Sequence, residues 1–238
     1  MKNIKFKICF TKRLFGKTYF KKKHRRVKMT LYIIRHGETE MNRQGIVQGC
    51  GVDSELNHIG KKQARLFYQY YKNVHFDFII TSDLKRTHQT VEPFLLRGTH
   101  RDWIKKPELN EISWGIHEGK AGDNATKENY HQLMNDWDSG VYETRIEGGE
   151  SAAELYERVS QVVDFIKDTH FEKKNILICT HGRTLLCLLT ILHGHPLSMM
   201  NKFRHQNTCL YKVHYVDGEF IFETENDVRH LGKLDIRY

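Results

Sequence analysis

Arginine and histidine side chains follow three apolar, β-rich runs of the chain. The run at residues 31–34 leads into Arg35-His36-Gly37-Glu38, and Asn42 comes shortly after it. A second run leads to Arg86, and a third leads to His181-Gly182. Because ligands bind beyond the carboxyl ends of the strands in an open parallel sheet, we expect these residues to converge. Together they predict a pocket for an oxyanion that contains a candidate nucleophile.

His36 has the surroundings that an imidazole nucleophile needs. The planar guanidinium groups of Arg35 and Arg86 suit bidentate binding of phosphate oxygens. Their positive charge disfavours the imidazolium, so we expect a lowered pKa for His36. Gly37 allows the backbone to turn close to the ring, where a carbonyl group can hold the second ring N–H and fix the tautomer. His181 and Gly182 are predicted to bind the same phosphate.

Two other predictions at this pocket have competing interpretations. Asn42 is a candidate phosphate donor, but an asparagine at this place also fits the start of a turn. Glu111, in the turn-rich stretch 107–115, is the candidate proton donor to a leaving alkoxide and general base for water. We expect a bound phosphate and the nearby Trp114 to raise its pKa. Glu108 and Glu118 are the competing carboxylates.

The segments that position these residues alternate between strand and helix patterns. Strands are predicted at residues 31–34, 76–81 and 175–180. Helices are predicted from the Asn57 cap to about Lys72, from the capping box at Ser151-Ala152-Ala153-Glu154, and over 185–192, which is apolar on all sides. Asp217-Gly218, between two β-rich runs, indicates a hairpin. This alternation predicts an α/β fold with a mostly parallel central sheet.

The net charge of +9 arises from one end of the chain. Residues 1–28 hold 12 of the 38 Lys and Arg and none of the 29 Asp and Glu, so residues 29–238 carry a net charge of −3. We therefore expect a basic tail over 1–28, one domain over 29–238, and no nucleic-acid binding by the folded part. The tail fits a disordered arm that binds an anionic partner, a targeting segment, or an extension upstream of a true start at Met29.

Cysteine use and hydropathy indicate the cellular setting. The five cysteines are widely spread and form no C-x-x-C pair, which favours a reducing, cytoplasmic compartment, with Cys179, Cys187 and Cys209 as core residues. The apolar stretch at 185–192 is far too short to span a bilayer. His193-Gly194-His195 has no acidic or cysteine partner, so it indicates a helix-end turn and not a metal site.

Arg-His-Gly-Glu-Thr after a first strand resembles the defining signature of the histidine phosphatase superfamily, which includes the phosphoglycerate mutases. The similarity extends over nearly all of residues 30–216. Further matches are Gln48-Gly49, Asp53, Leu56, Gly60, Gln63-Ala64, Ser82, Leu84, Arg86, Thr90, Leu109-Asn110-Glu111, Gly149-Glu150-Ser151 and Thr180-His181-Gly182. The resemblance implies a three-layer α/β/α sandwich of the phosphoglycerate mutase type. It also implies that His36 is phosphorylated, that Arg35, Arg86 and His181 complete the pocket, and that Glu111 carries the proton.

Two departures favour the phosphatases of this superfamily over its mutases. Ile112 stands where mutases have the arginine of a Glu-Arg pair. Between Ile112 and Glu147 only Lys120, Lys127 and Arg145 are cationic, against seven acids, a poor match to phosphoglycerate. We therefore expect a phosphomonoesterase, without metal or other cofactor, that acts on a small phosphorylated metabolite. The alternatives are a phosphoglycerate mutase and an inactive domain that binds a partner through its basic tail.

Overall fold

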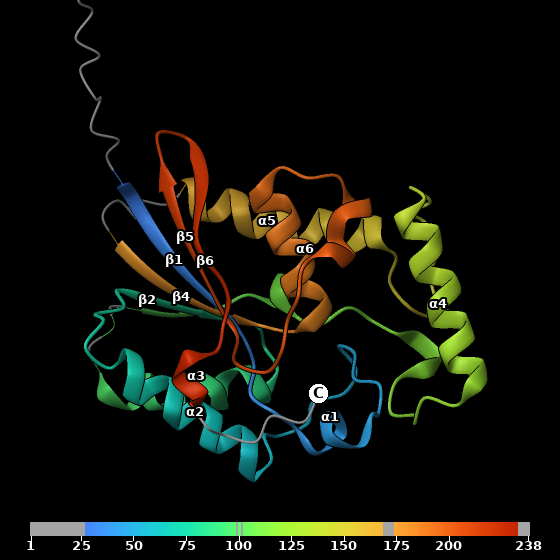
Figure 1. The fold of residues 1–238 in the computed structure, drawn as a ribbon, viewed down its shortest axis with the longest axis horizontal. Helices are drawn as coiled ribbons and strands as arrows, with labels where there is room; N and C mark the ends of the chain where they lie inside the picture. The colour runs from blue at the N-terminus through green and yellow to red at the C-terminus, as the bar shows by residue number, and fades with distance from the viewer. Residues whose placement is uncertain (1–26, 99, 101, 169–173, 233–238) are drawn as a thin grey trace, which may run out of the picture.

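The computed structural model describes residues 27–98, 100, 102–168 and 174–232, so the predictions for the basic tail lie outside the described residues. Figure 1 shows a central sheet with helices on both sides. The strands are β1 (Val27–Arg35), β2 (Phe78–Thr81), β3 (Asp102–Lys105), β4 (Lys174–Thr180), β5 (Leu210–Val216) and β6 (Glu219–Asp227). The helices are α1 (Glu40–Gln44), α2 (His58–Tyr71), α3 (Lys85–Arg97), α4 (Asn124–Asp138), α5 (Ala152–Asp168) and α6 (Gly182–His193).

The six strands form one mixed sheet in the order β3-β2-β4-β1-β5-β6. The strands β3, β2, β4 and β1 are parallel to one another, whereas β5 is antiparallel to both of its neighbours, β1 and β6. Asp217 and Gly218 both have positive φ between β5 and β6, which confirms the predicted hairpin. The strand β1 begins at Val27, two residues before the domain boundary predicted at Met29.

Alternate residues of β1 divide the core into two layers. Leu31 and Ile33 pack with buried residues of α5 and α6, whereas Tyr32 and Ile34 pack with those of α2 and α3. Helices α5 and α6 thus cover one face of the sheet and α2 and α3 cover the other, as Figure 1 shows. This arrangement confirms the predicted α/β sandwich with a mostly parallel sheet.

The caps of the predicted helices lie where the sequence indicates them. The Asn57 side chain caps α2 by accepting from Gly60 N at 2.8 Å. Ser151 and Glu154 form the predicted capping box of α5, with bonds of 2.9 and 3.3 Å. Helix α6 ends at His193 with Gly194 in the left-handed region, so the predicted helix-end turn is confirmed. Cys179, Cys187 and Cys209 are fully buried, also as predicted.

Helix α4 and the edge strand β3 are elements that the sequence patterns did not indicate. Strand β3 is short and largely exposed, so it lacks a buried face. Helix α4 stands apart from the sheet in Figure 1 and has few buried residues. Among the described residues, no helix is both long enough and apolar enough to cross a membrane.

Candidate active site

The ends of β1 and β4 bring two histidines together across 145 positions of sequence. Arg35 of β1 pairs in register with Thr180 of β4, and His36 N donates to Thr180 O at 2.9 Å. His36 and His181 follow directly, with ring centroids 5.1 Å apart. The predicted convergence at the carboxyl ends of the strands is therefore present.

The His36 ring is held in one tautomer. Its Nδ1 lies 2.7 Å from the carbonyl oxygen of Gly37, which can only accept, so Nδ1 carries the proton and Nε2 is free of it. Gly37 is required by a close approach of two chain segments, because a Cβ there would lie 2.8 Å from Gly60 O. The carbonyl contact expected after His36 is thus made by Gly37 itself.

The pKa of His36 lies well below its ordinary value, and burial is the largest cause. The charges of Arg86 and then Arg35 lower it further. Only 3% of His36 is exposed, so the charged imidazolium would lose most of its hydration. The sequence indicated the two arginines as the cause, whereas removal from water contributes more.

Arg86 is fixed by three acceptors in a fully buried position. Its Nε donates to His181 Nδ1 at 3.0 Å, its Nη1 to Val52 O at 2.6 Å, and its Nη2 to Gly49 O at 3.3 Å. Burial lowers its pKa to about 10, which leaves the guanidinium charged at neutral pH. Arg35 lies across the pocket, where its Nη1 is 3.2 Å from His205 Nδ1.

His181 lies behind Arg86 and not at the surface of the pocket. Its Nδ1 accepts from Arg86, so Nε2 carries the proton and donates to Ser82 Oγ at 2.8 Å. Both ring nitrogens are therefore engaged in a residue with 0% exposure. The sequence predicted that His181 and Gly182 bind phosphate together, but of the two only Gly182 lines the cavity in the described structure. His181 instead provides an acceptor for Arg86 Nε.

Asn42 makes local contacts at the start of α1 and also lines the cavity. It lies in α1, where its Oδ1 accepts from Thr39 N at 3.2 Å and its backbone N–H donates to Thr39 Oγ1 at 3.1 Å. Asn207 Nδ2 also approaches the same Oδ1, at 3.3 Å. Because these bonds use the oxygen, the amide nitrogen remains as the donor, and Asn42 lines the cavity.

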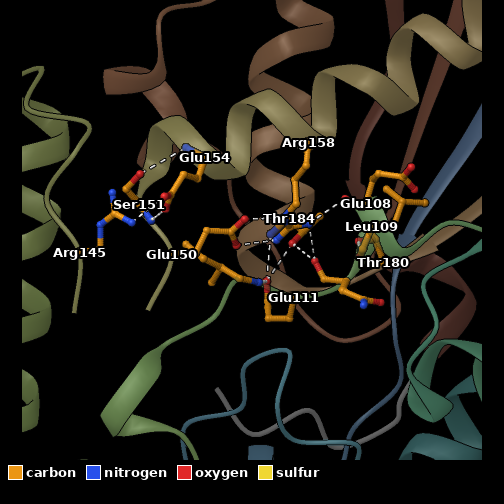
Figure 2. A network of polar contacts seen from close by, with 12 residues as sticks. Glu108, Leu109, Glu111, Arg145, Glu150, Ser151, Glu154, Arg158, Thr180 and Thr184 are labelled. Carbon is orange, nitrogen blue, oxygen red and sulfur yellow. Dashed lines mark hydrogen bonds and ion pairs between the residues drawn. The ribbon is translucent and has the colours of Figure 1, made fainter. Parts of the chain in front are cut away.

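Glu111 is the predicted carboxylate that reaches the cavity. Figure 2 shows it beside the first turn of α6. Its Oε1 accepts from Ile112 N at 3.0 Å, Thr184 N at 3.0 Å and Thr184 Oγ1 at 3.1 Å, and its Oε2 accepts from Arg183 N at 3.1 Å. The competitor Glu118 instead accepts from Gly51 N and Trp114 N, both at 2.9 Å.

The cavity has a volume of about 380 Å³, and α4 forms its outer wall. Lys127 and Tyr130 of α4 and the neighbouring Arg183 line that wall. Among the described residues, Glu111 is the single carboxylate in the lining, so none of the seven acids counted between Ile112 and Glu147 faces the ligand space. The acid count that favoured a phosphatase over a mutase therefore does not describe the cavity.

His205 is a pocket residue that the sequence did not indicate. It lies on the segment between residues 202 and 210, beside Arg35 and Gly182. Burial and the charges of Arg35 and Arg183 lower its pKa to about 3, so it is neutral. No cluster of three or more metal-ligating side chains occurs within the described part of the chain.

Comparison with known proteins agrees with this geometry. The model of the histidine phosphatase superfamily (branch 1) matches residues 31–228. A probable phosphoglycerate mutase GpmB of Yersinia pestis (strain Pestoides F) is 32% identical over 208 residues, which cover 85% of this chain and 95% of the relative. The crystal structure of an alpha-ribazole phosphatase from Shigella flexneri superposes with a TM-score of 0.74 at 27% identity, covering 84% of this chain and 96% of the other.

A second solved structure is similar over the same region. The phosphoserine phosphatase from Entamoeba histolytica, solved in complex with 3-phosphoglyceric acid, has a TM-score of 0.71 at 29% identity and covers 85% of this chain and 99% of its own. The family match includes the strand that ends at Arg35, the loop of Glu111 and the start of α6. With its fold and its clustered histidines and arginines, the chain belongs to the histidine phosphatase superfamily, branch 1.

Proposed function

We propose that the chain is a phosphomonoesterase that forms a phosphohistidine on His36 Nε2 and acts on a small phosphorylated metabolite. The observation that carries the proposal is the bond from His36 Nδ1 to Gly37 O at 2.7 Å, which leaves Nε2 as the unprotonated atom of a ring flanked by two arginines. Phosphatase and mutase activities among its relatives support phosphoryl transfer as the reaction class.

In the first step the Nε2 lone pair forms a bond to phosphorus while the bond from phosphorus to the ester oxygen breaks. Arg35, Arg86 and the amide nitrogen of Asn42 neutralise charge on the phosphoryl oxygens. The leaving alkoxide takes a proton from Glu111. In the second step water attacks phosphorus, the P–N bond breaks, and Glu111 receives a proton from the water. The route uses no metal ion or other cofactor.

The oxygen Oε2 of Glu111 is the atom that we assign to the proton. Two backbone N–H groups hold Oε1, together with a Thr184 hydroxyl whose single proton is shared with Asn110 O, whereas Oε2 accepts one bond, from Arg183 N. A Cβ added at Gly182, which lines the cavity, would lie 3.4 Å from Oε2. A glycine at this position therefore leaves the proton-bearing oxygen accessible from the ligand space.

A phosphoglycerate mutase is the second candidate, because it uses the same residues and differs only in the acceptor of the phosphoryl group. The cavity lining supports this candidate, since Lys127 and Arg183 offer positive charge to a substrate carboxylate. The inactive domain that binds through a basic tail is less favoured, because a scaffold has no need of the arrangement of His36, Arg86 and Glu111.

Assays of the purified chain separate these functions. Phosphate release is measured from a panel of phosphate monoesters, and isomerisation of 3-phosphoglycerate is measured beside it. We expect hydrolysis to dominate, and we expect His36→Ala to lower it by at least about 10³-fold because the covalent route is lost. Mass spectrometry of the intact chain after mixing with substrate should show a phosphoryl adduct that His36→Ala lacks.

Three results would decide against parts of the proposal. Unchanged hydrolysis by His36→Ala would remove this site as the seat of activity. Fast isomerisation with negligible phosphate release would replace the phosphatase by the mutase. Absence of both activities and of the adduct would favour the binding module.

A further inference from the structure

Arg158 of α5 joins two segments that are far apart in the sequence and lie beside Glu111. Its Nη1 donates to two backbone carbonyls of the loop that carries Glu111, Glu108 O at 2.7 Å and Asn110 O at 2.9 Å. Its Nε and Nη2 bind the Glu150 carboxylate at 2.5 and 2.8 Å. Figure 2 shows the guanidinium between Glu150 and the loop at residues 108–112, which we call the acid loop because it carries Glu111.

Glu150 is itself tied to the chain that follows the acid loop. Its backbone N–H donates to Ser113 O at 2.9 Å. Gly149 fits closely here, because a Cβ there would lie 2.8 Å from the same carbonyl oxygen. The Glu150 carboxylate therefore presents a fixed target, and Arg158 spans from it to the residues immediately before Glu111.

The acid loop needs this connection because packing does not fill its outer side. The side chains of Leu109 and Ile112 are fully buried and anchor the loop on its inner side. On the outer side a second cavity of about 380 Å³ borders Asn110, Glu111 and Arg158. Since a cavity offers no packing contacts, the polar bonds to the loop carbonyls fix the peptides just before Glu111.

The contacts of Asn110 connect Arg158 to the carboxylate. Asn110 O accepts both from Arg158 Nη1 and, at 2.7 Å, from Thr184 Oγ1. The same Thr184 hydroxyl contacts Glu111 Oε1 at 3.1 Å. A shift of the Asn110 peptide therefore disturbs the donor that also orients the carboxyl group.

We propose that Arg158, anchored by Glu150, is a positioning residue that sets the location of Glu111 for proton transfer. This inference rests on the proposed function, in which Glu111 protonates the leaving group. A guanidinium is required because one group must serve a carboxylate bidentately and two carbonyls at once, which a lysine ammonium does not do.

The test uses leaving groups that differ in their need for a proton. An alkyl phosphate such as glycerol 1-phosphate leaves as a basic alkoxide, whereas 4-nitrophenyl phosphate leaves as a stable phenolate. For Arg158→Gln we expect kcat/KM, which covers the steps up to phosphorylation of His36 and not the attack of water that both esters share, to fall about 10- to 100-fold on the alkyl ester and about threefold or less on the nitrophenyl ester. Arg158→Lys, which keeps the charge, should show the same split.

Arg145→Gln is the matched control. Arg145 also pairs with an acid near the start of α5, through Nη1 to Glu154 Oε1 at 2.6 Å, and it borders the same second cavity. Within the described part of the chain it contacts the carboxylates of Glu154 and Glu143 and not the loop that carries Glu111. We expect its activity on both esters to stay within about twofold of the starting enzyme, as is usual for exposed ion pairs.

A double-mutant cycle with Glu111→Gln distinguishes positioning from a general structural role. If Arg158 acts through Glu111, Arg158→Gln should cost little more in the Glu111→Gln background. Multiplicative losses, equal losses on both esters, or behaviour like Arg145→Gln would overturn the inference while Glu111 keeps its role. Full activity of Glu111→Gln on the alkyl ester would overturn the proposed role of Glu111 and the inference with it. Glu150→Gln, which keeps the side-chain size, provides the same test should Arg158→Gln not fold.

Discussion

Acidification should unfold this protein at an unusually high pH for a domain of its size. Four histidines that lie wholly or largely inside the fold have lowered pKa values, because burial disfavours their charged form. The pKa is well below 6.5 for His36 and His181, about 3 for His205 and about 4 for His230. In the unfolded chain each returns to about 6.5. Below that pH the unfolded state binds more protons than the folded state, so stability is complete above pH 6.5 and falls as the pH decreases.

The size of the effect follows from the number of protons. His205 and His230, with pKa values of about 3 and about 4, stay neutral in the folded state at pH 5, so each should cause a loss of about 2 kcal/mol of stability between pH 7.5 and pH 5. The two together amount to about 4 kcal/mol, a large part of the free energy of unfolding of a typical domain, and the lowered pKa values of His36 and His181 act in the same direction. Carboxylates with lowered pKa, such as Glu154, lose their stabilising effect only below about pH 4.5. The loss of stability between pH 7.5 and pH 5 therefore comes from the histidines.

Urea unfolding followed by tryptophan fluorescence at a series of pH values measures this dependence. We expect the free energy of unfolding to fall steeply from pH 6.5 to pH 5. His230→Asn is the informative variant, because His230 lies outside the pocket, where its Nε2 is 3.1 Å from Thr208 Oγ1. It should remove about 2 kcal/mol of the loss between pH 7.5 and pH 5, the share of one buried histidine. A free energy of unfolding that stays constant within about 1 kcal/mol from pH 7.5 to pH 5 would refute the reasoning.

Two further substitutions test the pocket. Ser82→Ala removes the acceptor of the buried His181 N–H, so we expect Arg86 to lose its fixed orientation. The cost of one unpaired buried donor should lower kcat/KM about tenfold. An unchanged kcat/KM in a folded variant would show that Arg86 does not depend on these hydrogen bonds. Lys127→Met should lower kcat/KM for 3-phosphoglycerate about two- to fivefold more than for glycerol 3-phosphate, because a charge contact with an exposed ammonium group is lost. Lys120→Met is its control, since Lys120 is absent from the described lining, and equal losses for the two substrates would exclude a carboxylate contact with Lys127.

The sheet and the centre of the site were predictable because local patterns determine them. Apolar β-rich runs identify β1, β2 and β4, and a parallel arrangement places whatever follows them at one edge. Arg35, His36, Arg86 and His181 were found in this way, and the structure brings all four together. The caps at Asn57 and Ser151 follow from side-chain chemistry within three residues.

The lining of the outer cavity was not predictable, because it depends on which way each side chain points and not on the amino-acid composition of the segment. Glu118 counts as an acid of the variable segment, yet its carboxylate is used by the N–H groups of Gly51 and Trp114. Asp123 caps α4 through Thr126 N at 2.7 Å and likewise faces away from the ligand. His205 belongs to no periodic pattern, since it enters the pocket from an irregular segment. Tertiary contacts place Glu118 and His205, whereas a local helix cap uses the Asp123 carboxylate.

The place of β1 within the sheet has a consequence for synthesis of the chain on the ribosome. Strand β1 is the first of the described strands to emerge, but its two neighbours in the sheet are β4 and β5, which begin at Lys174 and Leu210. Throughout translation of the intervening chain, an apolar strand with two unpaired edges has no native partner, which is the condition that favours aggregation and chaperone binding. The strand that leads to the nucleophile is therefore the first of the described strands to be made, and its pairing in the sheet is complete only once β5 has been made as far as Val216.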